Sequence, residues 1–193
     1  LDVPLPLQYL RWLQGLVTGN LGTSYFQRKE VLTLILQAFK YTFVMAIAAY
    51  IIAIVIGLLF GVLAAVYHNR IIDRILMSLS VFGISAPSFW IAIILQIFVG
   101  LKLGWFPVSG VKSAVWWVLP SFSLGIRSAA SIARVTRTSM LEVMKQDYIR
   151  TAFAKGISYP RIIFFHAFRN ALIPIMTILG NDFGVLLTGS MIT

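Results

Sequence analysis

The chain of 193 residues is 59% hydrophobic and only 11% charged, whereas about 25% of the residues in an average soluble domain are charged. A soluble fold of this length cannot bury so much apolar side chain, so the composition excludes a freely soluble globular protein and favours an integral membrane protein. The net charge is +10 and cysteine is absent, which excludes disulfides and thiolate chemistry. Because the bases lie between apolar runs, they indicate membrane orientation rather than nucleic-acid binding.

Residues 1–41 are mixed in composition and are predicted to form an extracytoplasmic or interfacial segment. The apolar residues between Leu7 and Val17 recur at helical spacing, but this stretch is too short and too charged to cross a bilayer. We therefore predict a helix that lies at the membrane surface, with Trp12 near the lipid headgroups. Residues 42–193 are predicted to form the transmembrane domain.

Two runs without any charged residue, 42–67 and 75–101, are each long enough to cross a hydrocarbon core of about 30 Å. Gly57 and Gly61 in the first run have the G-x-x-x-G spacing that lets another helix approach closely, although two small residues can fall four apart by chance. Pro87 in the second run predicts a bend, which is either static or part of a gate.

Two further spans are predicted at 114–133 and 165–190, which makes the chain an all-α polytopic membrane protein with four visible spans. The first of them is the weaker, because it contains Arg127. A base at this depth is costly, so it is expected to face water, a partner or a pathway, or to extend toward the surface. The second is interrupted by Pro174 and carries one acid, Asp182.

Residues 134–169 hold the densest group of Lys and Arg, which places this segment on the cytoplasmic side. Its apolar residues recur at helical spacing and predict an amphipathic helix that Gly156 ends in a left-handed cap. Such a helix either lies flat on lipid or docks in a cleft of another protein. The apolar positions are Met144, Tyr148, Ile149, Ala152, Phe153 and Ile157.

The sequence carries no pattern typical of an enzyme. HExxH, paired carboxylates, G-x-S-x-G and P-loop motifs are absent, and His68 and His166 lie far apart. We therefore predict no catalytic residue, no cofactor and no metal site. Ion-coupled transporters tend to carry intramembrane acids, and Asp182 is the single candidate here. The chain is expected to depend on a partner for its energy.

Residues 134–156, RVTRTSMLEVMKQDYIRTAFAKG, closely resemble the cytoplasmic loop of ABC importer permeases of the dipeptide/oligopeptide/nickel branch. Five further motifs follow the same family in the right order, so the resemblance covers nearly the whole chain. They are Leu1–Tyr9 (LDVPLPLQY), Gly19–Ser24 (GNLGTS), Ser85–Trp90 (SAPSFW), Leu103–Gly110 (LGWFPVSG) and His166–Pro174 (HAFRNALIP).

The resemblance implies the type I ABC importer permease fold, with six spans of which four are visible here. It also implies a coupling helix at about Glu142 to Gly156, within a cytoplasmic loop at about 138–161, that docks in a groove of an ATPase. The general signature Glu-Ala-Ala-x-x-x-Gly keeps its second alanine and its glycine, whereas Arg150 and Thr151 stand at its first two positions. The implied coupling residues are Glu142, Asp147, Arg150, Thr151, Ala152, Ala154, Lys155 and Gly156.

The implied function is that of a membrane-spanning permease subunit of an ATP-driven importer in the bacterial or archaeal cytoplasmic (inner) membrane. It moves di- or oligopeptides, or a similar small solute such as nickel, into the cytoplasm by alternating access. The implied partners are membrane lipid, a second permease subunit that forms a heterodimer with this chain, two ATP-binding subunits and an extracytoplasmic binding protein. The alternative is an ion-coupled secondary transporter or channel. Candidates for the pathway or a subunit interface are Gly57, Gly61, Pro87, Arg127 and Asp182.

Overall fold

The computed structural model describes residues 4–108, 110 and 113–189, and their regular secondary structure is helical apart from one isolated β-bridge between Thr23 and Glu30. Residues 1–3 and 109, which belong to two of the motifs above, and residue 190, at the predicted end of the last span, lie outside the described residues. The chain divides into two compact units, Leu1–Val44 and Met45–Thr193. The boundary predicted at 41/42 marks the start of the membrane domain and stays a prediction.

The first unit contains helix α1 (Leu5–Thr18) and the first part of α2 (Val31–Val66). Pro6 lies in the first turn of α1, where its missing N–H is not needed. The helix ends at Gly19, whose φ of 77° is the left-handed conformation that glycine adopts without strain. No residue of α1 is buried, and the rings of Tyr9 and Trp12 stack 5.9 Å apart. Its position at a membrane surface stays a prediction.

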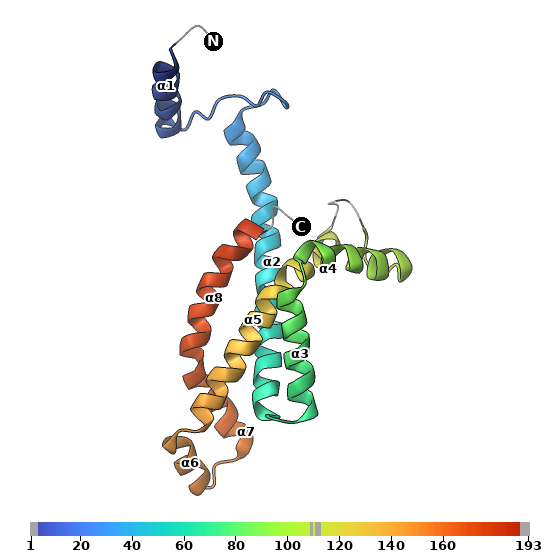
Figure 1. The fold of residues 1–193 in the computed structure, drawn as a ribbon, viewed down its shortest axis with the longest axis vertical. Coiled ribbons are helices and arrows are strands. Elements are labelled where there is room, and N and C mark those ends of the chain that lie inside the picture. Colours follow the sequence, from blue (N-terminus) through green and yellow to red (C-terminus); the bar gives the residue numbers. More distant parts are fainter. Residues whose placement is uncertain (1–3, 109, 111–112, 190–193) are drawn as a thin grey trace. The chain divides into compact units, whose positions relative to one another are not determined.

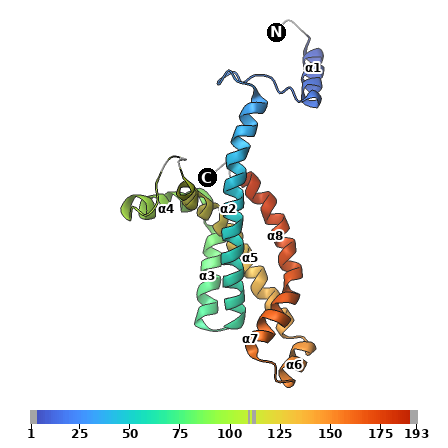
Figure 2. The same ribbon diagram turned by 180° about the vertical axis from the view of Figure 1, so that it is seen from behind.

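The second unit contains the rest of α2 and the other helices (Figures 1 and 2). The α-helices are α3 (Ile71–Ser85), α4 (Ser88–Leu95), α5 (Val118–Met144), α6 (Asp147–Ala154), α7 (Tyr159–Arg161) and α8 (Arg169–Gly189). Two π-helical turns, η1 (Gln96–Lys102) and η3 (Ile162–Phe168), and a 3₁₀ turn, η2 (Ala114–Trp117), extend them. Both views show α5 between α3 and α8, and it packs against both helices.

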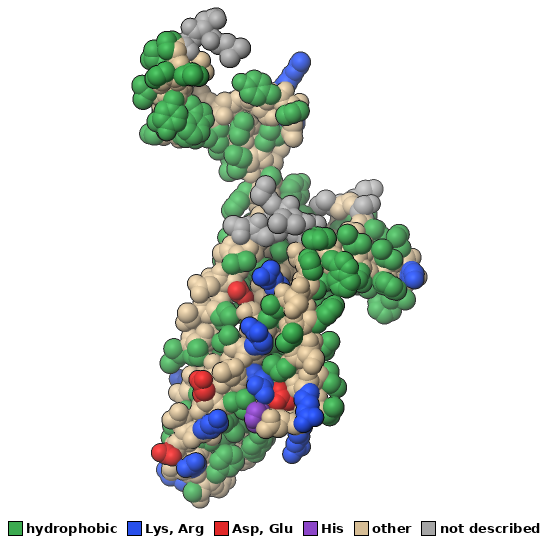
Figure 3. All heavy atoms as spheres, viewed as in Figure 1, with side chains coloured by type: hydrophobic (Ala, Val, Ile, Leu, Met, Phe, Trp, Pro, Cys, Tyr) green, Lys and Arg blue, Asp and Glu red, His purple; other side chains and the backbone are tan. Residues whose placement is uncertain are grey.

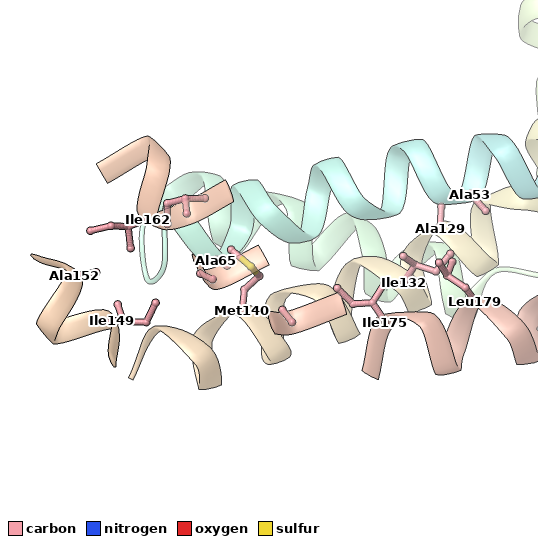
Figure 4. Packing of buried hydrophobic residues seen from close by; sticks show 13 residues of the cluster. Ala53, Ala65, Ala129, Ile132, Met140, Ile149, Ala152, Ile162, Ile175 and Leu179 are labelled. Atoms are coloured by element: carbon pink, nitrogen blue, oxygen red, sulfur yellow. The ribbon is translucent and has the colours of Figure 1, made fainter. Parts of the chain in front are cut away.

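The core of the second unit is built largely from small side chains. On α2, alanines and glycines that include Ala49, Ala53, Gly57 and Gly61 are buried. One buried cluster continues from Ala53 through α5 and α8 toward the end where α6 lies (Figure 4). Small residues let helices approach closely, which supplies packing contacts where apolar burial alone gives no driving force in a membrane.

By length and composition, two helical stretches among the described residues are suited to cross a membrane, α2 and Tyr159–Leu187. The pair Ile71–Ser85 and Ser88–Lys102 makes a third if it counts as one span, although it is bent by 108°. The sequence predicted four spans, and the difference is the segment 114–133 in η2 and α5. Helix α5 is less apolar than the other long helices, α2 and α8, because it carries arginines and many hydroxyl residues.

Two predicted helix boundaries differ from the structure. Helix α8 continues through Pro174, so the last span is not interrupted there; membrane helices tolerate a proline because neighbouring groups satisfy the freed carbonyl. The amphipathic helix predicted at 142–156 is divided, since α5 ends at Met144 and α6 begins at Asp147. Glu142 therefore belongs to the last turn of α5.

Candidate functional site

Helix α6 is attached to the rest of the second unit by two apolar side chains. Ile149 is 1% exposed and Ala152 is 6% exposed. They belong to the same buried cluster as Met140 of α5 and Ile162 of η3, and Figure 4 shows them on the side of α6 that faces Ile162. Burying a side chain of the size of isoleucine contributes about 1.5–3 kcal/mol, which is enough to hold a helix of two turns in place.

The opposite side of α6 is exposed. We define the outer face of α6 as Asp147, Tyr148, Arg150, Thr151, Phe153 and Ala154. Tyr148 and Phe153 are 43% and 45% exposed, so of the apolar positions predicted on this helix the chain itself buries Ile149 and Ala152 and leaves these two open. Adjacent residues of a helix point about 100° apart, and they cannot share a narrow face. Asp147 and Arg150 form an ion pair of 3.6 Å that is open to solvent and contributes little.

Seven of the eight implied coupling residues are exposed, and Ala152 is the buried one. Ala152 therefore holds α6 in place, and it is not available to a docking partner. Tyr148 and Phe153 belong to the same exposed surface but were left out of the predicted site. The sequence could have indicated their exposure, because Tyr148 precedes Ile149 and Phe153 follows Ala152. Neighbouring residues of a helix point in different directions, so Tyr148 and Phe153 point away from the buried side.

A glycine turn ends α6. After Lys155, Gly156 has φ 73°. The N–H of Ile157 donates to the carbonyl of Ala152 at 3.2 Å, and the N–H of Gly156 donates to that of Phe153 at 2.9 Å. These bonds satisfy carbonyls that the helix leaves without a partner. A Cβ at Gly156 would meet nothing within 4 Å, so the backbone conformation rather than space requires glycine there.

Gly57 and Gly61 lie against α5 of the same chain. A Cβ on Gly57 would stand 2.8 Å from the carbonyl oxygen of Ala129, and a Cβ on Gly61 would stand 2.7 Å from that of Ala133. Either distance is too short for a real contact, so α2 and α5 meet backbone to backbone. The sequence left a pathway or a subunit interface open for these glycines, and the structure places them in a helix contact within the chain.

Pro87 directly precedes α4 at the break that follows α3, where the chain bends by 108°. The break lies beside an open hollow of about 330 Å³, which Pro87 lines together with Phe82, Phe89 and Trp90. The rings of Phe82 and Trp90 meet edge to face at 6.1 Å across this bend. This aromatic contact between α3 and α4 favours a fixed angle between the two helices.

Arg127 and Asp182 are the two charged residues predicted to lie on the pathway or at a subunit interface, and the structure brings them near each other. Arg127 is exposed on α5 and Asp182 is half-buried on α8. Asp182 lies close enough to Ser128 and Arg127 to interact with the hydroxyl of the first and the charge of the second. Its Oδ2 atom is buried without a hydrogen-bond partner among the described residues. Polar groups of α5 and α8 thus lie close together around Asp182.

A buried charge cluster, which the sequence did not predict, joins α3 to α5. Asp73 is 3% exposed and accepts two hydrogen bonds from Arg137, from Nε at 2.6 Å and from Nη2 at 2.8 Å. The N–H of Asn69 donates to the same carboxylate at 2.9 Å, and His68 Nδ1 lies 3.2 Å from Arg137 Nη2. Asp73 and Arg137 are 64 positions apart in the sequence, and no local sequence pattern predicts that they pair.

Asp73→Asn is expected to lower the free energy of unfolding by about 3 kcal/mol, because it leaves the guanidinium of Arg137 without its buried partner. Thermal unfolding of the purified protein in detergent measures the effect. Asp147→Asn is the matched control, since Asp147 lies on the exposed face of α6 and its ion pair is open to solvent. Equal stability of the two variants would contradict a structural role for the Asp73–Arg137 pair.

Long apolar helices in close backbone contact are the architecture of an α-helical membrane protein. Residues 57–193 match the family described as "Binding-protein-dependent transport system inner membrane component". The chain therefore belongs to this family of inner-membrane transport components. The resemblance read from the sequence motifs is confirmed, and so is the all-α membrane fold class.

Similar proteins include the glutathione transport system permease protein GsiC of Pectobacterium atrosepticum, which is 39% identical over 192 residues. The proteins of the same name from Salmonella paratyphi A and Escherichia coli K12 are 40% and 39% identical over the same length. Each alignment covers 100% of this chain and 63% of the relative. The chain thus spans less than two thirds of the length of these proteins.

Proposed function

We propose that this chain forms the greater part of a permease subunit in an ATP-driven importer, which moves peptides or peptide-like solutes into the cytoplasm by alternating access. The observation that carries the proposal is α6, a helix held by Ile149 and Ala152 on one side and open on the other. It stands at the end of the long helix α5, in the segment whose sequence resembles the coupling loop of such importers. Family membership supports the same function.

The geometry supports a mechanical role for α6. In the proposed cycle, ATP binding closes a pair of ATPase subunits, and each ATPase displaces the outer face of α6. Ile149 passes the displacement to Met140 of α5 because they share one packed cluster. The Asp73–Arg137 pair passes it on to α3. The spans then change from inward-open to outward-open as packed bodies.

The proposed cargo is a peptide or a peptide-like solute. The relatives named above are called glutathione transport permeases, and glutathione is a small peptide. Nickel, the other solute typical of this branch, has less support. Among the residues that the structure describes, no three metal-binding side chains come together.

The proposed assembly contains two permease subunits, which we expect to be different gene products, two ATPase subunits and an extracytoplasmic binding protein. The family description names dependence on a binding protein and an inner-membrane location. The dense bases of 134–169 place α6 on the cytoplasmic side, where an ATPase reaches it.

ATP-dependent uptake tests the proposal. The full-length permease, purified from its native membrane with the proteins bound to it and placed in liposomes, is expected to take up peptide when ATP and loaded binding protein are supplied. Collapse of the proton and sodium gradients should leave this uptake unchanged. Uptake that follows an ion gradient and ignores ATP would instead support the ion-coupled transporter.

A further inference from the structure

Two glycine contacts show how deep Arg127 lies. A Cβ on Gly125 would stand 2.6 Å from the carbonyl oxygen of Ala49, and the carbonyl of Ala129 reaches Gly57 in the same way. Arg127 is therefore level with the part of α2 between Ala49 and Gly57. This part is the middle of the charge-free run of α2, so Arg127 lies near the centre of the bilayer.

A guanidinium at that depth costs about 3 kcal/mol or more if it faces lipid, so it is expected to face water or a partner. Lipid phosphate lies in the headgroup region and does not occur at the centre of the bilayer. Among the residues that the structure describes, Arg127 forms no ion pair within 4.0 Å. Asp182 of α8 interacts with its charge from beyond that distance, so the guanidinium donors remain open to a ligand.

Arg127 belongs to a polar stripe that follows one side of α5. Arg127, Ser131, Arg134 and Thr138 are spaced by three or four residues, which places them on one helix face. All but the half-buried Ser131 are exposed. Figure 3 shows basic side chains one below another on the face where α5 lies. The opposite side of α5 packs against α2, so the stripe is the side of α5 that this chain leaves uncovered.

A polar, basic stripe in a membrane helix of a transporter is suited to line a water-filled path. Its charge also selects what it binds. The planar guanidinium of arginine pairs with a carboxylate through two parallel hydrogen bonds, and the low dielectric of the site strengthens them. Every peptide with a free C-terminus carries such a carboxylate.

We propose that Arg127 binds the carboxylate of the transported solute as the solute passes the middle of the membrane. This inference rests on the proposed function and makes it more specific. It assigns to the permease a preference of its own for carboxylate-bearing solutes, separate from the selection made by the binding protein.

The test compares two peptides and two proteins in one cycle. ATP-driven uptake of a dipeptide and of its C-terminal amide is measured in liposomes that hold the complete importer, either wild type or Arg127→Gln. The loaded binding protein is supplied at saturation. Because both importers use the same binding protein, its own preference cancels in the comparison. Arg74→Gln, an exposed arginine of α3 outside the stripe, is the matched control.

The expected result is a preference for the free dipeptide that falls about tenfold or more in Arg127→Gln and stays at the wild-type value in Arg74→Gln. If Arg127→Gln fails to assemble, Arg127→Lys serves instead, and it should lose part of the preference because an ammonium cannot form the paired bonds. A preference that is unchanged in the assembled variant would overturn the proposal. Equal loss for both peptides would assign Arg127 to a partner subunit or to folding. A wild-type importer without ATP-driven uptake would overturn the proposed function instead.

Discussion

Gly61→Ala is expected to lower the free energy of unfolding of the permease by about 1–3 kcal/mol, because overpacking of a tight contact carries that cost. The added methyl group would stand 2.7 Å from the carbonyl oxygen of Ala133, and this oxygen is backbone and cannot turn aside. The side chain of Thr136 blocks the other direction. Helix α2 must therefore move away from α5, and the buried alanines around it lose contact. A leucine at the same position should prevent assembly of the two helices.

Gly180→Ala on α8 is the matched control, because a Cβ there would meet nothing within 4 Å. Like Gly61→Ala, it replaces a helical glycine by the better helix former alanine, but it adds no clash. It should therefore leave the unfolding temperature unchanged or raise it slightly. Both variants are compared by thermal unfolding of the detergent-purified protein and by the amount that assembles in the membrane. The backbone contact between α2 and α5 would be refuted by a Gly61→Ala protein as stable as the control.

Gly156→Val is expected to lower transport at least tenfold while ATP hydrolysis continues, so that fewer solute molecules enter per ATP. The left-handed φ of 73° costs an ordinary residue about 1–2 kcal/mol, and a β-branched residue more. The turn that closes α6 then opens, and the bond from Ile157 to Ala152 is lost. A helix with a frayed end passes less of the displacement to α5.

Gly156→Asn separates backbone conformation from the mere presence of a side chain. Asparagine tolerates the left-handed region, and the space around the site is open, so this variant should keep nearly normal coupling. The ratio of solute taken up to ATP hydrolysed is the quantity to measure. If valine leaves that ratio unchanged, α6 does not act as the coupling element.

Hydropathy is a local property, so the sequence located the apolar runs that lie in α2 and α8, whereas their role as membrane spans stays a prediction. Helix α5 was the weakest prediction, and the structure explains why: its polar stripe lowers the hydropathy while its other side packs on the glycines of α2. Composition averages the two sides of a helix. It cannot separate a helix that crosses a membrane beside water from one that does not cross.

The sequence predicted where the candidate site on α6 lies in the chain, but not which side of the helix is buried and which is exposed. The motif marks the segment that we propose as the coupling element, and Gly156 predicted the end of helix α6. Periodicity alone did not reveal the break at Lys145 and Gln146, since the apolar spacing continues across it. The pairing of Asp73 with Arg137 joins residues 64 positions apart, and only the packing of α3 on α5 brings them together.

The two sides of α6 respond differently to ionic strength. The inner side is held by Ile149 and Ala152, which are apolar, so dissolved salt does not weaken that attachment. The outer face carries Asp147 and Arg150 in full contact with solvent, where counterions screen charges over a Debye length of about 8 Å at physiological salt. In the proposed assembly, salt is therefore expected to weaken the binding of an ATPase to the outer face without weakening the attachment of α6 to its own chain. The strength of docking and the stiffness of transmission are in this way set by separate forces.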